Sequence, residues 1–386
     1  MHGPAGPGDR RIVIAPNCLR GYASAAEVAR ALAEGVAEAF PQAETVCLPL
    51  ADGGDGTLDV LAAAVGGRAH HVDAYDALGQ VRSVRWLELP DGAAAIESAG
   101  ICGLGALTPG RLDPLGASSR GVGQVIVAAL EAGMANLVLG LGGTAVVDGG
   151  AGALAALGAR FTDAAGRDVD PVPRHLDQAA SVDLEPARAR LAGTSIALWS
   201  DVRTPLSGNL DSFGAQKGLH DGNRPQAARA LRHLVNLLAA TDPGAPDRFA
   251  APWFGAGGGT GFGLSGVART EAAHGAEALA ARVDPEDLIG RAALVLTAEG
   301  AVDASSWHGK LTGAIARRRS RAGRPTALLA VHATGGEPPA LTSIHTLSEP
   351  GAGLTPITGA ALHRGLAEAA RQACVRWKSH LDWEQP

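Results

Sequence analysis

The chain has 386 residues, which favours two domains of ordinary size over a single core. A hydrophobic fraction of 46% and a charged fraction of 19% exclude a disordered chain, and a net charge of −6 argues against surfaces for nucleic acid or anionic membranes. No apolar run reaches the roughly 20 residues of a membrane helix, and the N-terminus does not resemble a signal peptide. The four cysteines lie far apart without a CxxC pair. We therefore expect a cytoplasmic protein with reduced thiols.

The first part of the chain alternates short apolar runs with helical segments. Residues 12–16 and 46–50 predict buried strands, and each is followed by a predicted helix. The first of these helices is expected to begin at the capping box SAAE, residues 24–27. This order is typical of a doubly wound parallel sheet, in which ligands bind at the carboxyl ends of the strands. Arg20 and Asp52 both follow such ends, which makes them candidate binding residues.

From about residue 68 the pattern changes to close-spaced strands, which indicate a meander and a second domain. We expect strands over 70–75, 81–89, 93–97, 136–139 and 196–199, helices over 121–132, 151–157 and 225–238, a loop over 213–218 and an irregular linker over 241–252. The earlier pattern then returns, with strands over 292–297 and 326–331 and helices over 311–321 and 360–375. The sequence thus predicts an α/β protein of two domains. One is discontinuous and doubly wound, residues 1–67 and 285–386, and the other is an inserted α/β domain, residues 68–284.

A glycine-rich turn lies between the predicted strand at 136–139 and the predicted helix at 151–157. It contains Gly142, Gly143, Thr144 and Asp148. Unpaired N–H groups at such a turn and at a helix N-terminus favour an anion, so one interpretation is a cradle for phosphate. The other is a tight turn whose glycines only allow close packing.

Several common motifs do not account for the chemistry. The chain has no GxxxxGK[ST], GxSxG, HExxH or EF-hand pattern. A GxGxxG at 261–266 follows no predicted strand, so a flexible loop or a helix start is favoured over a dinucleotide site. His70 and His71 would point to opposite faces of a strand, which disfavours a metal site.

What is left is a set of acidic turns that follow predicted strands, together with cations in comparable turns. The acidic residues are Asp52, Asp148, Asp201, Glu299 and Asp303, and the cations are Arg20, Lys217 and Lys310. Carboxylates suit Mg²⁺, which bridges substrate phosphates. Lysine and arginine offset the charge of a transferring phosphoryl group, and a further carboxylate can accept the proton of an attacking hydroxyl. One such turn is usually a helix cap, but the set fits phosphoryl transfer to a small acceptor.

With these motifs the chain resembles the type I glycerate kinases of bacteria over nearly its whole length. The resemblance rests on IAP at 14–16, SAAE at 24–27, PLADGGDGT at 49–57, GLGGTA at 140–145, DGGAG at 148–152, SDV at 200–202, FGAQKG at 213–218, EGAVD at 299–303 and HGK at 308–310. The family implies a discontinuous flavodoxin-like domain and an inserted α/β domain, with the active site in the cleft between them. It also implies phosphorylation of glycerate, commonly to 2-phosphoglycerate, with ATP and Mg²⁺.

The chain departs from the family pattern in two informative loops. The first loop reads NCLRG at 17–21, where the family usually has Asp-Ser-Phe-Lys-Gly. Val146 and Val147 replace a usual Thr-Asn pair. We expect these changes to affect the acceptor, so a related small hydroxy acid or a specialised metabolite stands beside glycerate. A homologue that has lost catalysis and binds a ligand is the alternative of another class.

The resemblance also suggests roles for the candidate residues. Asp201 is the expected general base, and Lys310 is expected on the phosphates. Arg20 is expected on the carboxylate or phosphate of the acceptor, while Glu299 and Asp303 are expected to bind Mg²⁺. The expected nucleotide-binding set is Asp52, Gly142, Gly143, Thr144, Asp148 and Lys217. The oligomeric state, including a homodimer, stays open.

Overall fold

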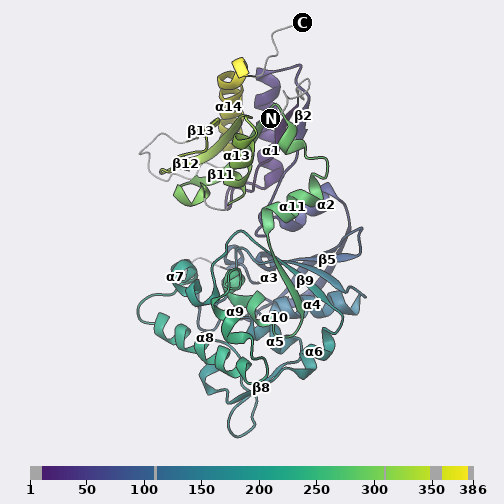
Figure 1. The fold of residues 1–386 in the computed structure, drawn as a ribbon, viewed down its shortest axis with the longest axis vertical. Helices are drawn as coiled ribbons and strands as arrows, with labels where there is room; N and C mark the ends of the chain where they lie inside the picture. The colour runs from purple at the N-terminus through teal and green to yellow at the C-terminus, as the bar shows by residue number, and fades with distance from the viewer. Residues whose placement is uncertain (1–10, 108–110, 308–309, 348–358, 381–386) are drawn as a thin grey trace. The chain divides into compact units, whose positions relative to one another are not determined.

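The computed structural model describes residues 11–107, 111–307, 310–347 and 359–380 (Figure 1). Two compact units are present. The first comprises the described residues of Met1–Asp52, Asp59–Ala64 and Ala276–Pro386, and the second comprises those of Gly53–Leu58 and Val65–Gly275. None of the helices that the structure describes is long and apolar enough to cross a membrane.

The first unit is built on a five-stranded parallel sheet. Its strands are β1 (Ile12–Ile14), β2 (Thr45–Cys47), β11 (Leu294–Val302), β12 (Thr326–Ala333) and β13 (Thr342–Thr346). The spatial order is β13-β12-β11-β1-β2, and every neighbouring pair is parallel. Counted along the chain this is the 2-1-3-4-5 order of flavodoxin-like sheets. The predicted fold class is therefore confirmed, and the sheet combines strands from the two ends of the chain.

Helices surround the strands of the first unit. They are α1 (Ala25–Ala39), α11 (Gly275–Val283), α12 (Leu288–Arg291), α13 (Leu311–Arg321) and α14 (Gly359–Trp377), while α2 (Thr57–Ala64) spans the boundary of the two units in the sequence. The predicted capping box begins α1, because the Glu27 carboxylate accepts a hydrogen bond of 2.8 Å from Ser24 N. Helix α1 packs along α14 (Figure 1). The contact is tight at Gly35, where a Cβ atom would lie 1.9 Å from the carbonyl oxygen of Ala367.

The second unit contains a six-stranded mixed sheet in the order β10-β9-β6-β5-β4-β3. The predicted meander is formed by β3 (Arg68–Tyr75), β4 (Val81–Glu88) and β5 (Ala93–Glu97), which are antiparallel. Beyond β5 the strands β6 (Asn136–Gly140), β9 (Ser195–Ser200) and β10 (Arg269–His274) continue the sheet in parallel. A separate antiparallel pair, β7 (Arg160–Thr162) and β8 (Ser181–Asp183), was not predicted.

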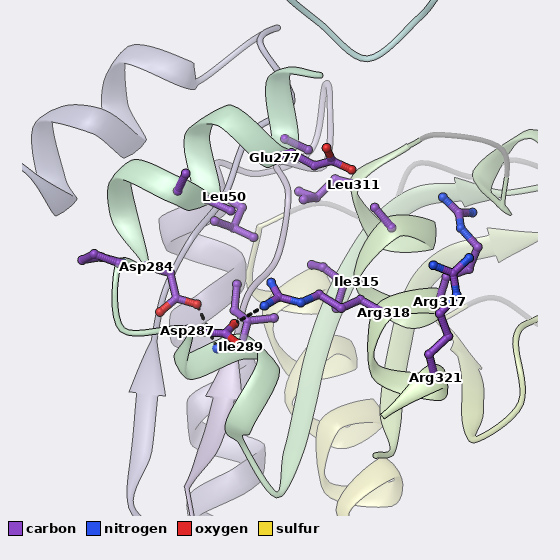
Figure 2. Close-up of a pocket in the computed structure, with 15 residues that line it drawn as sticks. Leu50, Glu277, Asp284, Asp287, Ile289, Leu311, Ile315, Arg317, Arg318 and Arg321 are labelled. Atoms are coloured by element: carbon purple, nitrogen blue, oxygen red, sulfur yellow. Dashed lines mark hydrogen bonds and ion pairs between the residues drawn. The ribbon is translucent and has the colours of Figure 1, made fainter. Parts of the chain in front are cut away.

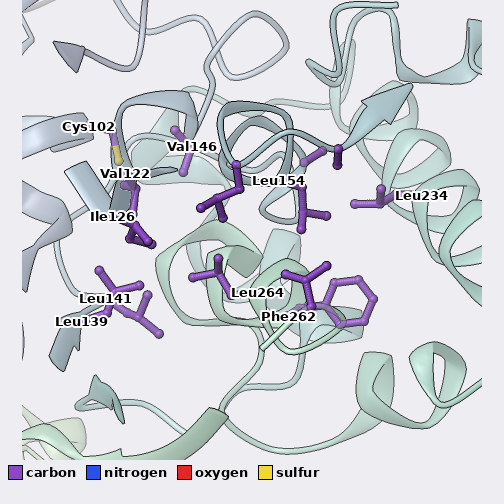
Figure 3. Close-up of a cluster of buried hydrophobic side chains, with 14 of the residues drawn as sticks. Cys102, Val122, Ile126, Leu139, Leu141, Val146, Leu154, Leu234, Phe262 and Leu264 are labelled. Atoms are coloured by element: carbon purple, nitrogen blue, oxygen red, sulfur yellow. The ribbon is translucent and has the colours of Figure 1, made fainter. Parts of the chain in front are cut away.

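The helices of the second unit enclose one large apolar core. They are α3 (Ser98–Cys102), α4 (Arg120–Glu131), α5 (Ala151–Ala156), α6 (Glu185–Arg190), α7 (Asn209–Phe213), α8 (Arg224–Ala239), α9 (Ala245–Ala250) and α10 (Thr260–Leu264). Figure 3 shows side chains of α4, β6, α5 and α10 that meet in this core, among them Ile126, Leu139, Leu154 and Phe262, all at most 1% exposed. Burial of this apolar area is the main favourable term in the stability of the unit.

Three expectations about local structure were wrong. The expected loop at 213–218 is the end of α7 followed by a 3-10 turn, Ala215–Lys217, and the expected linker at 241–252 contains α9. Glu299 does not follow a strand but lies within β11, since β12 supplies pairing partners on both sides of Gly300. Elements of one turn carry no full hydrophobic period, and strand extensions depend on a neighbouring strand, so neither leaves a local signal. The GxGxxG segment at 261–266 begins within helix α10, in agreement with its interpretation as a helix start rather than a flexible loop.

Candidate functional site

The first unit gathers polar side chains at the carboxyl ends of β1, β2 and β11. The loop after β1 is held to both neighbours: Asn17 Nδ2 donates to Asp52 Oδ2 at 3.1 Å, and Asn17 N donates to the carbonyl of Ala298 at 3.3 Å. Arg20 is exposed in the turn that follows. This edge is where flavodoxin-like sheets bind ligands. The structure therefore brings the expected residue Asp52 beside Asn17, which is one of the departures from the family pattern.

Glu299 is the centre of a second cluster in this unit. Its two carboxylate oxygens accept hydrogen bonds of 2.7 Å from Lys310 Nζ and from Thr312 Oγ1. The Glu299 side chain is only 13% exposed, whereas that of Lys310 is 34% exposed and occupies the N-cap of α13. Asp303 Oδ1 accepts from Ser306 N at 3.2 Å, and so caps the 3-10 turn Ala304–Trp307. His308 and Gly309 of the HGK motif lie outside the described residues.

The two expected magnesium ligands can be compared with this geometry. In the part of the chain that the structure describes, no three His, Cys, Asp or Glu side chains lie close enough to hold a metal ion together. Mg²⁺ is, however, commonly bound by one or two carboxylates, with water and substrate phosphates as its other ligands. Glu299 and Asp303 offer the oxygen donors of such a site. Their chemistry fits Mg²⁺.

In the second unit, the glycine turn after β6 packs against another glycine turn. Gly142 N donates to the carbonyl of Gly53 at 3.0 Å, and a Cβ atom on Gly142 would lie 2.7 Å from Gly54 Cα. Gly143 has a φ of +74°, which favours glycine. The two turns thus approach backbone to backbone, as the close-packing interpretation expects. Phosphate binding by the exposed parts of the turn stays a prediction.

Asp148 is fully buried and bonded within its own chain. Oδ2 accepts from Ser119 N at 2.7 Å, Ser119 Oγ at 2.8 Å and Gly152 N at 3.2 Å, and Oδ1 accepts from Gly150 N at 3.1 Å. Burial raises the pKa of this carboxyl, and the hydrogen bonds from Ser119 oppose that shift. Asp148 therefore links the first turns of α4 and α5. A direct contact with a nucleotide would need an exposed oxygen, which this carboxylate lacks, so we assign it a positioning role instead.

Lys217 lies behind the same glycine turn. Its side chain is buried, and Nζ donates to the carbonyl of Val146 at 2.8 Å and to Thr144 Oγ1 at 3.4 Å. Burial lowers the pKa of Lys217 to about 8. Nearby Cys102 is buried as well, and desolvation raises the pKa of its thiol to about 12. Lys217 therefore supports the backbone of the turn from inside the unit.

The valines of this turn correct one expectation. We expected Val146 and Val147 to mark an altered acceptor site, but both side chains are fully buried and belong to the core of the second unit. Figure 3 shows Val146 among these core side chains. The bond from Lys217 goes to a backbone carbonyl, which is present whatever side chain stands at 146. The two valines thus add apolar packing.

The strand ends beside Asp201 contain residues that the sequence did not single out. Asp201 directly follows β9, and His274, the last residue of β10, pairs in register with Ser200. Trp253 contacts His274 edge-on, with ring centroids 6.1 Å apart, and the Arg203 guanidinium lies 5.4 Å from the Trp253 ring centroid. Trp253 has a φ of +78°, which is uncommon for a non-glycine residue. No local pattern links residues 203, 253 and 274.

Of the two adjacent histidines 70 and 71, His70 has two side-chain contacts in the sheet. His70 stacks on Trp86, with ring centroids 4.1 Å apart, and its Nε2 lies 2.7 Å from Glu88 Oε2. These contacts lie within the β3–β4 pair.

Fold and site together define a class before any relative is considered. The protein is an α/β protein whose flavodoxin-like sheet presents carboxylates, a lysine and hydroxyls at its carboxyl edge, the groups with which phosphotransferases bind phosphates and Mg²⁺. The model of the glycerate kinase family matches residues 12–363, and the chain belongs to this family. It is accordingly a phosphotransferase that acts on a hydroxyl group.

Individual relatives agree with this assignment. The chain is 34% identical over 331 residues to glycerate 2-kinase of Escherichia coli K12, covering 83% of this chain and 84% of the relative. It is 34% identical over 312 residues to glycerate kinase of Bacillus subtilis 168, and the match covers 80% of this chain and 81% of the relative. A crystal structure of a protein described as glycerate kinase 2 from Salmonella typhimurium LT2 is similar with a TM-score of 0.76 and 31% identity, covering 96% of this chain and 99% of that one.

Proposed function

We propose that the protein transfers the γ-phosphoryl group of ATP to a hydroxyl of glycerate, forming 2-phosphoglycerate, or of a related small hydroxy acid. Family membership supports the reaction class. The structural observation that carries the proposal is the bonded set of Lys310, Glu299 and Thr312 at the carboxyl edge of the flavodoxin-like sheet. A cytoplasmic location, expected from the sequence, is part of the same proposal.

The reaction needs one proton acceptor and compensation of the phosphate charge. The acceptor hydroxyl oxygen forms a bond to the γ-phosphorus as the bond from phosphorus to the ADP oxygen breaks, and Asp201 takes the hydroxyl proton. Lys310 offsets charge on the phosphates, and Arg20 binds the carboxylate of the acceptor. Glu299 and Asp303 would hold Mg²⁺, which neutralises charge on the phosphates when it is bound.

The remaining expected residues support the nucleotide in different ways. Gly143 and Thr144 would offer a backbone N–H group and a hydroxyl to phosphate oxygens, and Gly142 would hold the turn in place through its bond to the carbonyl of Gly53. Asp52 would act on the phosphates from the same end of the sheet, beside Asn17. Lys217 and Asp148 act from behind the turn, because both are buried and bonded to its backbone. Their effect on turnover would therefore pass through the shape of the turn.

The test is release of ADP from ATP with Mg²⁺ across a panel of hydroxy acids that includes D- and L-glycerate, with the product position assigned by NMR. Asp201→Asn should lower kcat by roughly 10²–10⁴-fold while ATP binding, measured by calorimetry, is retained. Asp211→Asn is the matched control, since Asp211 is an 83% exposed carboxylate of the same unit. Unimpaired turnover in Asp201→Asn would refute the assignment of the base. ATP binding without turnover on any acceptor would favour the alternative of a non-catalytic ligand-binding homologue.

A further inference from the structure

The first unit contains a cavity of about 640 Å³ for which the reaction described so far has no use. It is lined by α11, α12 and α13, and by Leu50 from the segment after β2 (Figure 2). Sites for small molecules are typically a few hundred to about 1,000 Å³ in volume. The cavity is therefore large enough for most of a metabolite rather than for a few water molecules.

Most of the lining is apolar, and alanines create the space. Leu50, Ile289, Leu311 and Ile315 are at most 6% exposed and form the floor. On α11, the residues that line the cavity include Ala276, Ala280 and Ala281, whose side chains are too short to reach across to α13. An apolar space of this kind suits a flat ring system, whose faces gain contact area without needing polar partners.

The polar residues of the lining differ in how far they are already engaged. At one end of the cavity, Arg318 pairs with Asp287 at 2.6 Å (Figure 2). Asp284 accepts from Leu288 N at 2.7 Å and Ile289 N at 2.9 Å, so it is committed to the start of α12. At the other end, where Figure 2 also shows Leu311, Glu277 is exposed, and its carboxylate forms no hydrogen bond or ion pair with any other described residue.

We propose that this cavity binds the nucleoside part of the phosphoryl donor, with the purine base on the apolar floor and the ribose hydroxyls donating to Glu277. The inference rests on the proposed kinase function. A carboxylate is the usual partner of ribose hydroxyls at other nucleotide sites, because an ionised oxygen accepts strong hydrogen bonds from them.

Two lining residues are close in sequence to residues assigned to the phosphates, and this indicates how the nucleotide would be oriented. Leu311 directly follows Lys310, which we assign to the phosphates, and Leu50 stands two residues before Asp52. Two residues span at most about 7 Å of extended chain. A nucleoside with its ribose at the Glu277 and Leu311 end would thus direct its phosphates toward these groups.

A different occupant would be an anionic effector held by the arginines of α13. The orientation of these side chains argues against it. Arg317 and Arg321 line the outer part and point away from Glu277 and Leu50 in Figure 2, and Arg318 is already paired with Asp287. No cluster of free cations therefore faces the floor among the described residues.

Filling the space tests the proposal. In the full chain, Ala280→Phe should weaken ATP binding, measured by calorimetry without acceptor, at least tenfold, since the larger side chain would occupy space that the nucleoside needs. The KM for the acceptor should stay within about twofold. Ala278→Phe is the matched control, because Ala278 lies on the same helix but does not line the cavity, and it should leave ATP affinity unchanged. Unchanged affinity in folded Ala280→Phe, or a raised KM for the acceptor alone, would overturn the proposal.

A second experiment decides the matter if Ala280→Phe does not fold. Glu277→Ala should weaken ATP binding by roughly fivefold to tenfold, the effect of one lost hydrogen bond. The affinity of the wild type should fall by a similar factor when ATP is replaced by 2′-deoxy-ATP or 3′-deoxy-ATP. Glu277→Ala should bind that analogue as well as it binds ATP, because the substitution and the analogue remove the same hydrogen bond. Additive losses would contradict a bond from Glu277 to the ribose. Because binding is measured apart from turnover, a wild type that binds ATP but phosphorylates no hydroxy acid of the panel would refute the proposed function and leave this inference standing.

Discussion

Replacing Asp148 with Asn keeps the shape of the side chain and removes its charge. The amide can turn its single oxygen toward the three donors at Oδ2, Ser119 N, Ser119 Oγ and Gly152 N, and then its NH₂ group faces Gly150 N–H. Three bonds that become neutral lose about 1 kcal/mol each, and the fourth bond is lost at a cost of about 1 kcal/mol. Relief from burying a charge offsets part of this, so the free energy of unfolding should fall by about 2–3 kcal/mol.

Urea unfolding followed by circular dichroism measures this loss, and amide hydrogen exchange at Gly152 and Ala153 should accelerate with it. Asp163→Asn provides the control, because Asp163 also accepts from two backbone N–H groups, of Ala165 and Arg167, but is only half-buried and begins a turn whose next residues are exposed. That variant should lose less than about 1 kcal/mol. If Asp148→Asn were as stable as the wild type but no longer bound ATP, the carboxylate would act on the ligand and our positioning role would be refuted.

Two further changes probe buried groups of each unit. The pKa of Lys217 is about 8 in the folded protein and 10.5 in the unfolded chain, so unfolding takes up protons between these two pH values. The wild type should therefore gain stability relative to Lys217→Met as the pH rises from about 8 to 10.5. A stability difference in urea titrations that does not change with pH would contradict a buried amine. Gly35→Ala should destabilise the first unit by about 1–3 kcal/mol, because its Cβ would meet the Ala367 carbonyl, whereas Gly365→Ala in α14, where only ordinary contacts arise, should be neutral or stabilising. Thermal melts in which both glycine variants gain stability would show that α1 and α14 are not in tight contact.

Much of the secondary structure was predictable because its signals are local. The capping box before α1, the apolar run of β5 and the helix Leu311–Arg321 each depend on residues within a few positions of one another. Parallel pairing followed from the alternation of such runs with helices. The strand order also required the two ends of the chain to meet, as Ile12 and Leu294 do, and here the resemblance to a family supplied what local patterns lack.

How much could be predicted about a candidate residue depended on how far along the chain its partners lie. That Asp52 and Asp201 follow strands could be read from the sequence, and so could the class of chemistry that carboxylates and lysines serve, whereas Glu299 lies within β11. Their burial could not. Asp148 meets Ser119, 29 residues earlier, and Lys217 meets Val146, 71 residues earlier, and both bonds hold loop backbone in place.

The sequence alone determined the α/β class, the parallel sheet and the family, because apolar periodicity, helix caps and the order of motifs depend only on which residues follow one another. Only the tertiary structure decided that Val146 and Val147 are core residues, that Arg203, Trp253 and His274 meet beside Asp201, and that alanines of α11 leave a cavity against α13. Arg319 shows the reason. It stands in the arginine-rich segment at 317–321, yet it is fully buried and donates to the carbonyls of Ile289, Ala292 and Pro325. Burial and hydrogen-bond partners depend on how distant segments pack together, so the residues adjacent in sequence do not predict them.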